Sequence, residues 1–283
     1  MNPSDVLSQF GLTQGVMTYV MTFGLMMMRI LTAITVIPFL GGRSMPGRFR
    51  ISLALALVIF LFPIVQAQIP NPVPDSYFLI GALFLKETLF GFLLGLVMGM
   101  VFYGVQAAGA MVDNQRQLAN AQIFNPGIGA QATIFGVFYY EFAVVIFILV
   151  QGHIFFFKGL IESFAVVPIY QLPDWMAGTA ALPRLTDLPV IKLVVRLSAE
   201  TLLIAVQMSA PVLIAIFIAD LILGLTNRIA PMVNVFEMGF NIKGWVGAAL
   251  VWLSLPVIYV QLKELFKHAL GGFNQVVQWF LAG

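Results

Sequence analysis

Six long apolar runs, separated by short polar stretches, dominate this sequence and constrain what it can fold into. They cover residues 16–40, 51–70, 77–112, 133–157, 190–225 and 244–262. An α-helix needs about 20 mostly apolar residues to cross the hydrocarbon core of a bilayer. Barrel strands would be shorter and would alternate between polar and apolar residues. The runs therefore predict an all-α, polytopic membrane protein with about six long hydrophobic helices or helical hairpins.

The composition agrees with a chain that lies in lipid or within a protein assembly. Charged residues make up 9 % of the 283 residues and hydrophobic residues 60 %, whereas soluble domains carry about 25 % charged residues. The net charge of +2 includes no basic tract for nucleic acid and no acidic tail. Because cysteine is absent, the chain has no disulfide, thiolate metal site or cysteine nucleophile. We expect one membrane domain over residues 1–283.

The lengths and flanks of the runs carry further information. Residues 77–112 and 190–225 each exceed a single simple crossing, so these helices are expected to tilt, kink or extend beyond the bilayer. Pro211 lies inside the second of them and predicts a kink. No Lys or Arg precedes the first run, so we expect no cleavable signal peptide.

Ionisable residues lie inside or beside the apolar runs. A charge at the bilayer centre costs roughly 2.5–3.5 kcal/mol on insertion scales, so these side chains must pair, line water or contact partner subunits. In order of preference, the alternatives are a buried ion-pair network, pairing between subunits, and a proton or substrate relay. Helical spacing places Lys192, Arg196 and Glu200 on one face. The full set is Arg29, Lys86, Glu87, Arg116, Glu141, Lys192, Arg196, Glu200, Asp220 and Arg228.

Three glycines follow one another at four-residue spacing in the third run. Gly91, Gly95 and Gly99 form a small-residue face of the predicted helix. Such a face lets two helix backbones approach closely. It predicts tight helix packing without chemistry, against a helix of this chain or of another.

A polar stretch separates the third run from the fourth. Residues 111–132 are rich in Asn and Gln and contain the Asn125-Pro126-Gly127 break, with Ile123 and Phe124 before it. Non-helical backbone at membrane depth is tolerated only where protein buries it or water surrounds it. The stretch is therefore a plain external loop, which the residues alone favour, or a re-entrant segment that enters a pore.

Catalytic motifs are missing from the sequence. It contains no HExxH, GxSxG, P-loop or GxGxxG pattern, and its two histidines, His153 and His268, have no evident ligand set. We therefore expect no enzyme, no bound metal and no cofactor. The main alternative to a structural subunit is an ion-coupled secondary transporter that uses Arg29, Glu87, Glu141 and Asp220 as a relay.

Several short motifs, in order along the chain, resemble those of a known family. They are Gly42-Arg43-Ser44-Met45-Pro46, Gly152-His153, Asn227-Arg228-Ile229-Ala230-Pro231 and Asn234-Val235-Phe236. Together they resemble the FliR/SctT family of type III secretion export-apparatus proteins, over nearly the whole chain.

Two further stretches bear on the branch of that family. Residues 111–116, which include Asp113 and Arg116, are similar to the Asp-x-Gln-Arg signature of the injectisome branch, although Gln117 stands where a Gly commonly follows. The stretch Met238-Gly239-Phe240 is more similar to the flagellar branch. The injectisome branch is modestly favoured.

The resemblance implies a place in an assembly. One copy would join several copies of two small hydrophobic partners, FliP/SctR and FliQ/SctS, in a helical, cone-like entry gate to which FlhB/SctU binds. The gate would lie in the bacterial inner membrane, within a secretion system or flagellar basal body, and would pass unfolded protein substrates. The embedded charges would then contact partner subunits.

The resemblance also implies a role for the polar stretch. The loop between the third and fourth hydrophobic segments is a channel plug in the family, which reverses the preference for a plain loop. The expected plug residues are Gln122, Ile123, Phe124, Asn125, Pro126, Gly127, Ile128 and Gly129.

Overall fold

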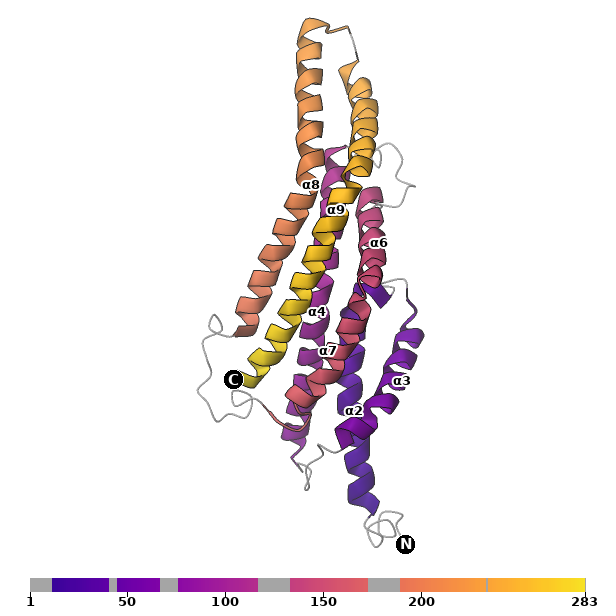
Figure 1. Cartoon of the computed structure of the whole chain (residues 1–283), viewed down its shortest axis with the longest axis vertical. Coiled ribbons are helices and arrows are strands. Elements are labelled where there is room, and N and C mark those ends of the chain that lie inside the picture. The colour runs from indigo at the N-terminus through magenta and orange to yellow at the C-terminus, as the bar shows by residue number, and fades with distance from the viewer. Residues whose placement is uncertain are drawn as a thin grey trace. The chain divides into compact units, whose positions relative to one another are not determined.

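The computed structural model describes residues 12–40, 45–66, 76–116, 133–172, 189–232 and 234–282. Every regular element in these ranges is a helix, as Figure 1 shows. The elements are α2 (Leu12–Val36), the 3₁₀ turn η1 (Pro38–Leu40), α3 (Gly47–Gln66), α4 (Tyr77–Gln115), α6 (Ile134–Leu149), α7 (Gly152–Val166), α8 (Pro189–Ile229) and α9 (Val235–Ala282). The all-α prediction is confirmed.

The helices have the length and composition of membrane spans. Five of them are long and apolar enough to cross a bilayer, and the bent pair α6 and α7 would make a sixth span. The five single spans are Met17–Val36, Gly47–Val65, Tyr77–Gln115, Val194–Ile229 and Glu237–Lys267. The chain is therefore a multi-pass membrane protein, as the apolar runs predict.

The fourth apolar run was expected to form one helix, but the structure breaks it. It divides into α6 and α7, whose axes are bent by 71° at the break. Gln151 adopts a positive φ of 59° there, and a Cβ at Gly152 would overlap the ring of Phe147. The left-handed residue ends the first helix, and the glycine lets the chain turn tightly against it. Hydropathy continues across such a break, which is why the run reads as unbroken.

The stretch between the fifth and sixth apolar runs, residues 226–243, is largely helical. α8 extends to Ile229 and α9 begins at Val235, so the sixth run lies within a much longer helix. Asn234 caps α9, because its Oδ1 accepts the Glu237 N–H at 3.4 Å and its Nδ2 donates to Glu237 Oε2 at 3.3 Å. The first of these bonds is an N-cap, in which the Asn side chain satisfies the N–H of the third helical residue. α8 continues through Pro211 as one helix.

The chain divides into two compact units. The first unit comprises Met1–Gly99, His153–Lys192 and Ala269–Gly283, and its described part contains α2, α3, the first part of α4, and α7. The second unit comprises Met100–Gly152 and Leu193–His268, with the rest of α4, α6, and most of α8 and α9.

Each unit has its own close-packed contacts. In the first unit, Gly91 and Gly95 of α4 lie against the backbone of α2, at Arg29 and Ala33. In the second, the fully buried rings of Phe102, Phe147 and Phe266 meet with centroids 5.0–5.4 Å apart. Aromatic pairs at this distance add about 0.5–1.5 kcal/mol each beyond their burial. These contacts join α4 to α6 and α9.

Candidate functional sites

A buried ion cluster lies in the first unit, where α2 meets α4. Arg29 donates from Nε and Nη2 to the two carboxylate oxygens of Glu87, at 2.5 and 2.9 Å. The Nζ of Lys86 lies 2.8 Å from Glu87 Oε1. All three side chains are at most 1 % exposed. The structure thus joins three of the embedded charges: a bidentate Arg29–Glu87 pair and the second cation, Lys86, beside it.

Carbonyl groups in the last turn of α7 and in the residues just after it accept the remaining hydrogen bonds of these cations. Arg29 donates to the carbonyls of Ser163 and Val167, at 2.9 and 2.8 Å. Lys86 donates to the carbonyls of residues 168, 169 and 171 at 2.8–3.0 Å. The last carbonyls of a helix lack partners within it and carry the negative end of its dipole. The cluster therefore also holds the end of α7 against α2 and α4.

A second polar cluster lies in the second unit, at the C-terminal end of α4. The buried Asp113 accepts the backbone N–H groups of Phe135 and Gly136 with Oδ2, at 2.7 and 3.4 Å. Arg116 Nη1 lies 3.7 Å from Asp113 Oδ1, and Nη2 donates to the Gly244 carbonyl at 3.1 Å. The expected plug residues, 122–129, lie outside the described residues, and this cluster is the last described structure before them.

The other embedded charges are distributed differently. Lys243, which is buried, forms an ion pair with Asp220. Arg196 and Glu200 form an exposed pair at 2.9 Å. The remaining side chains of the set, Lys192, Glu141 and Arg228, are exposed.

The small-residue face of α4 packs within the chain. A Cβ at Gly91 would overlap the Arg29 carbonyl and the Thr32 hydroxyl, and one at Gly95 would lie 2.8 Å from the Ala33 carbonyl. The partner helix of these two glycines is therefore α2. Gly99 is buried as well.

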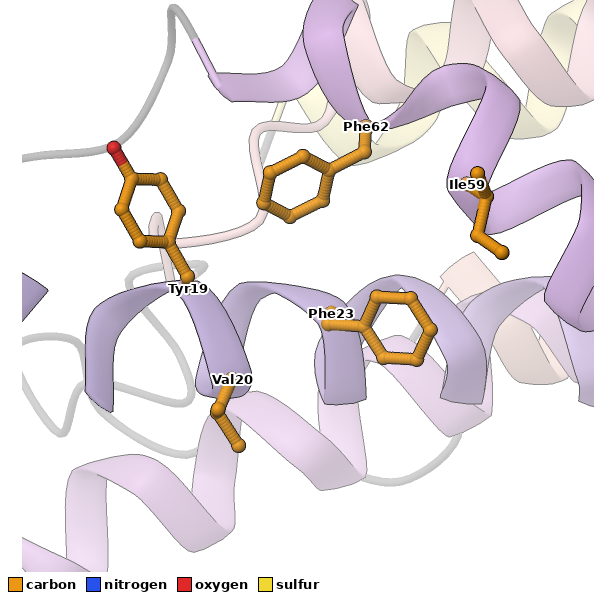
Figure 2. A pocket seen from close by; sticks show the side chains of 5 residues that line it. All are labelled: Tyr19, Val20, Phe23, Ile59 and Phe62. Atoms are coloured by element: carbon orange, nitrogen blue, oxygen red, sulfur yellow. The ribbon is translucent and has the colours of Figure 1, made fainter. Parts of the chain in front are cut away.

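An apolar groove of about 410 Å³ lies between α2 and α3 (Figure 2). Its lining residues are Tyr19, Val20, Phe23, Ile59 and Phe62. The rings of Tyr19 and Phe62 lie next to each other in it, tilted by 51° with centroids 5.9 Å apart. The lining carries no carboxylate, imidazole or amine. The groove therefore suits apolar contact, and the phenol of Tyr19 is the polar group of its lining.

No group of three or more metal-ligating side chains occurs among the described residues. His153, in the first turn of α7, is half-buried, and its Nδ1 has no hydrogen-bond partner in the described structure.

Sequence reasoning singled out Arg29, Lys86 and Glu87 but not three residues that complete the clusters. Asp113 was expected only as part of a family signature, and Lys243 and Ser163 were not among the expected residues. For Asp113 and Lys243, the available signal was a lone charge beside an apolar run. Such a residue needs a partner, but its spacing along the chain does not name one.

Comparison with known proteins identifies the family. The family model described as "Bacterial export proteins, family 1" matches residues 20–269. The flagellar biosynthetic protein FliR of Bacillus subtilis is 30 % identical over 245 residues, which cover 87 % of this chain and 90 % of that protein. The Yop proteins translocation protein T of Yersinia pestis is 28 % identical over 250 residues, 88 % of each chain.

A more distant relative is the surface presentation of antigens protein SpaR of Shigella sonnei, 22 % identical over 231 residues, 81 % of this chain and 83 % of that protein. Flagellar and secretion-system proteins thus match at similar identity, so the preference for the injectisome branch is minor. Because the family model covers most of the chain and the relatives align along nearly their whole length, the chain belongs to family 1 of the bacterial export proteins, the FliR/SctT family of the type III export apparatus.

Proposed function

We propose that this protein is a non-enzymatic subunit of a type III export gate in the bacterial inner membrane, through which unfolded proteins pass. The observation that carries the proposal is the family match over residues 20–269 of a chain built from membrane-spanning helices. Within each unit, the charged side chains pair with one another and bind helix ends. That is the chemistry of a structural subunit. We propose that residues 1–283 act as a single gate domain.

The proposed partners are FliP/SctR-like and FliQ/SctS-like subunits in a helical, cone-like assembly, with an FlhB/SctU-like subunit bound to it. Exposed charges on apolar helices indicate that partner subunits, and not lipid alone, cover these helices. Glu141 is exposed on α6 among exposed apolar side chains such as Val137, Phe138 and Val145. A charge facing lipid is costly, whereas a partner subunit can supply a counter-charge. We propose that these charges set the register between subunits.

Residues 122–129 are proposed to close the channel at rest. Ile123, Phe124 and Ile128 would provide apolar bulk, which resists ion passage by excluding water. Pro126 and Gly127 would let the segment move without breaking helical hydrogen bonds. The support for this role is the composition of the segment and its place in the family pattern.

The test is a deletion of residues 124–129 in cells that assemble the gate. We expect ion leak across the inner membrane to rise, because the proposed obstruction is gone. A replacement of the same six positions by Gly and Ser keeps the length of the connection and serves as the matched variant. If leak and secretion are both unchanged in the deletion variant, the plug role is wrong.

A second experiment tests the partners. Affinity purification of this chain from cells that express the whole export apparatus should recover two small hydrophobic subunits in stable association. Recovery of the chain alone, together with proton-dependent uptake by the purified chain in vesicles, would favour the ion-coupled transporter instead.

A further inference from the structure

The N-terminal end of α6 is capped from another helix. The residue at its N-cap position, Thr133, makes no side-chain capping hydrogen bond. The first N–H groups of a helix have no partner within the helix and need one. Here Asp113 of α4 accepts the N–H groups of Phe135 and Gly136, the second and third residues of α6. These are the donors that a local cap would bind, and the carboxylate also suits the positive end of the helix dipole.

Glycines bring the same two helix ends into direct backbone contact. A Cβ at Gly109 of α4 would overlap the backbone carbonyl of Phe135. One at Gly136 of α6 would lie 3.3 Å from the Gln106 carbonyl. The carboxylate of Asp113 can therefore reach across, because no side chain stands between the two backbones.

Arg116 extends this arrangement to a third helix. Its guanidinium carbon lies 4.5 Å from the ring centroid of Phe135, and its Nη2 binds the Gly244 carbonyl of α9. Gly247 leaves the space for this side chain, since a Cβ there would lie 2.6 Å from Arg116 Cδ. One carboxylate and one guanidinium thus hold α4, α6 and α9 together at a single point.

We infer that Asp113 and Arg116 act as a clamp that positions both ends of residues 117–132, the connection that carries the proposed plug. Arg116 is the last described residue before this connection and Thr133 the first after it. On the side before the connection, Arg116 binds α9 at the Gly244 carbonyl. On the side after it, Asp113 binds the N–H groups of Phe135 and Gly136 at the start of α6. The inference rests on the proposed function, because the position of these ends matters only if the connection closes the channel.

The test measures ion leak for each assembled gate in cells. D113A removes the acceptor for two N–H groups, and we expect leak for each gate to rise about ten-fold, since an unsatisfied buried group shifts a local equilibrium by this order. D113N has the same size and retains one acceptor oxygen, so its leak should lie between that of D113A and wild type. N114A and Q115A change exposed residues on the same helical turn and should leave leak unchanged.

A second set of variants acts on Arg116. G247A displaces Arg116 without changing any charge, and should raise leak in the same direction as D113A. R116K keeps a cation beside Asp113 and a donor for the Gly244 carbonyl, so it should leak less than R116A. A smaller leak in R116K than in R116A would show that the position of the cation matters, and not a general loss of folded protein. The amount of assembled gate in each strain is measured by co-purification with the partner subunits.

The outcomes distinguish the inference from the proposed function. If deletion of residues 124–129 causes leak but D113A, D113N and G247A do not, the clamp is wrong and the plug stands. D113A could instead reduce the amount of assembled gate while the ion leak of each assembled gate stays at the wild-type level. In that case Asp113 is only structural and the clamp is again wrong. If the deletion itself causes no leak, the proposed plug fails first, whatever the clamp variants do.

Discussion

Glu87 neutralises two buried cations, so its charge governs the stability of the whole cluster around it. Replacing it by Gln would leave Arg29 and Lys86 buried without their shared counter-charge. Breaking a buried pair by removing one partner typically costs about 3–5 kcal/mol. We expect E87Q to lower the thermal unfolding midpoint of the purified gate and the amount of the protein in membranes.

The matched control for this substitution is E200Q. Glu200 forms an ion pair with Arg196, but that pair is exposed, and exposed pairs contribute about 0–1 kcal/mol. E200Q should therefore leave the unfolding midpoint nearly unchanged. Equal midpoints for E87Q and E200Q would show that the buried cluster does not stabilise the fold.

Helix packing on α4 can be tested with two glycines of one helix. G91A places a methyl group where the carbonyl of Arg29 already lies, so α2 must move away from α4. Overpacking of this kind typically costs about 1–3 kcal/mol. G81A, by contrast, adds a Cβ with nothing within 4 Å and should be neutral or slightly stabilising. Equal thermal midpoints for G91A and G81A would contradict the close contact between α2 and α4.

The start of α9 depends on its N-cap residue, Asn234. N234A removes the oxygen that accepts the Glu237 N–H, and should destabilise the first turn of α9 by about 1 kcal/mol. Amide hydrogen exchange over residues 235–240 is expected to accelerate, with the rest of α9 unaffected. N241A, at an exposed position inside the same helix, is the control and should not accelerate exchange. Exchange rates that do not differ between the two variants would show that the cap is dispensable.

At the scale of the whole molecule, the exposed apolar surface predicts burial by partners. Large side chains such as Phe217 of α8 and Trp252 of α9 are 57 and 71 % exposed. Because the chain has no cysteine, F217C and W252C each introduce a unique reporter. We expect a membrane-permeant maleimide to label both in cells that lack the partner subunits, and to label them much less in the assembled gate. Equal labelling with and without partners would mean that these surfaces face lipid.

The sequence by itself determined the class of protein and the approximate positions of its helices. Long apolar runs leave a helix as the available structure in lipid, and that constraint is local to each run. The short motifs also sufficed to indicate the family, which the comparisons then established. Local signals were less precise at helix ends, because hydropathy continues across the break at Gln151, whereas the first turns of α9 precede the sixth apolar run.

Only the tertiary structure decided which polar groups meet. Glu87 pairs with Arg29, 58 residues away, and Asp113 caps a helix that begins about twenty residues later. The sequence predicts that each buried charge needs a partner, since an unpaired charge in an apolar environment is costly. It does not predict which one, because the choice depends on how helices distant in the chain pack. That packing rests on close contacts such as those at Gly91 and Gly109.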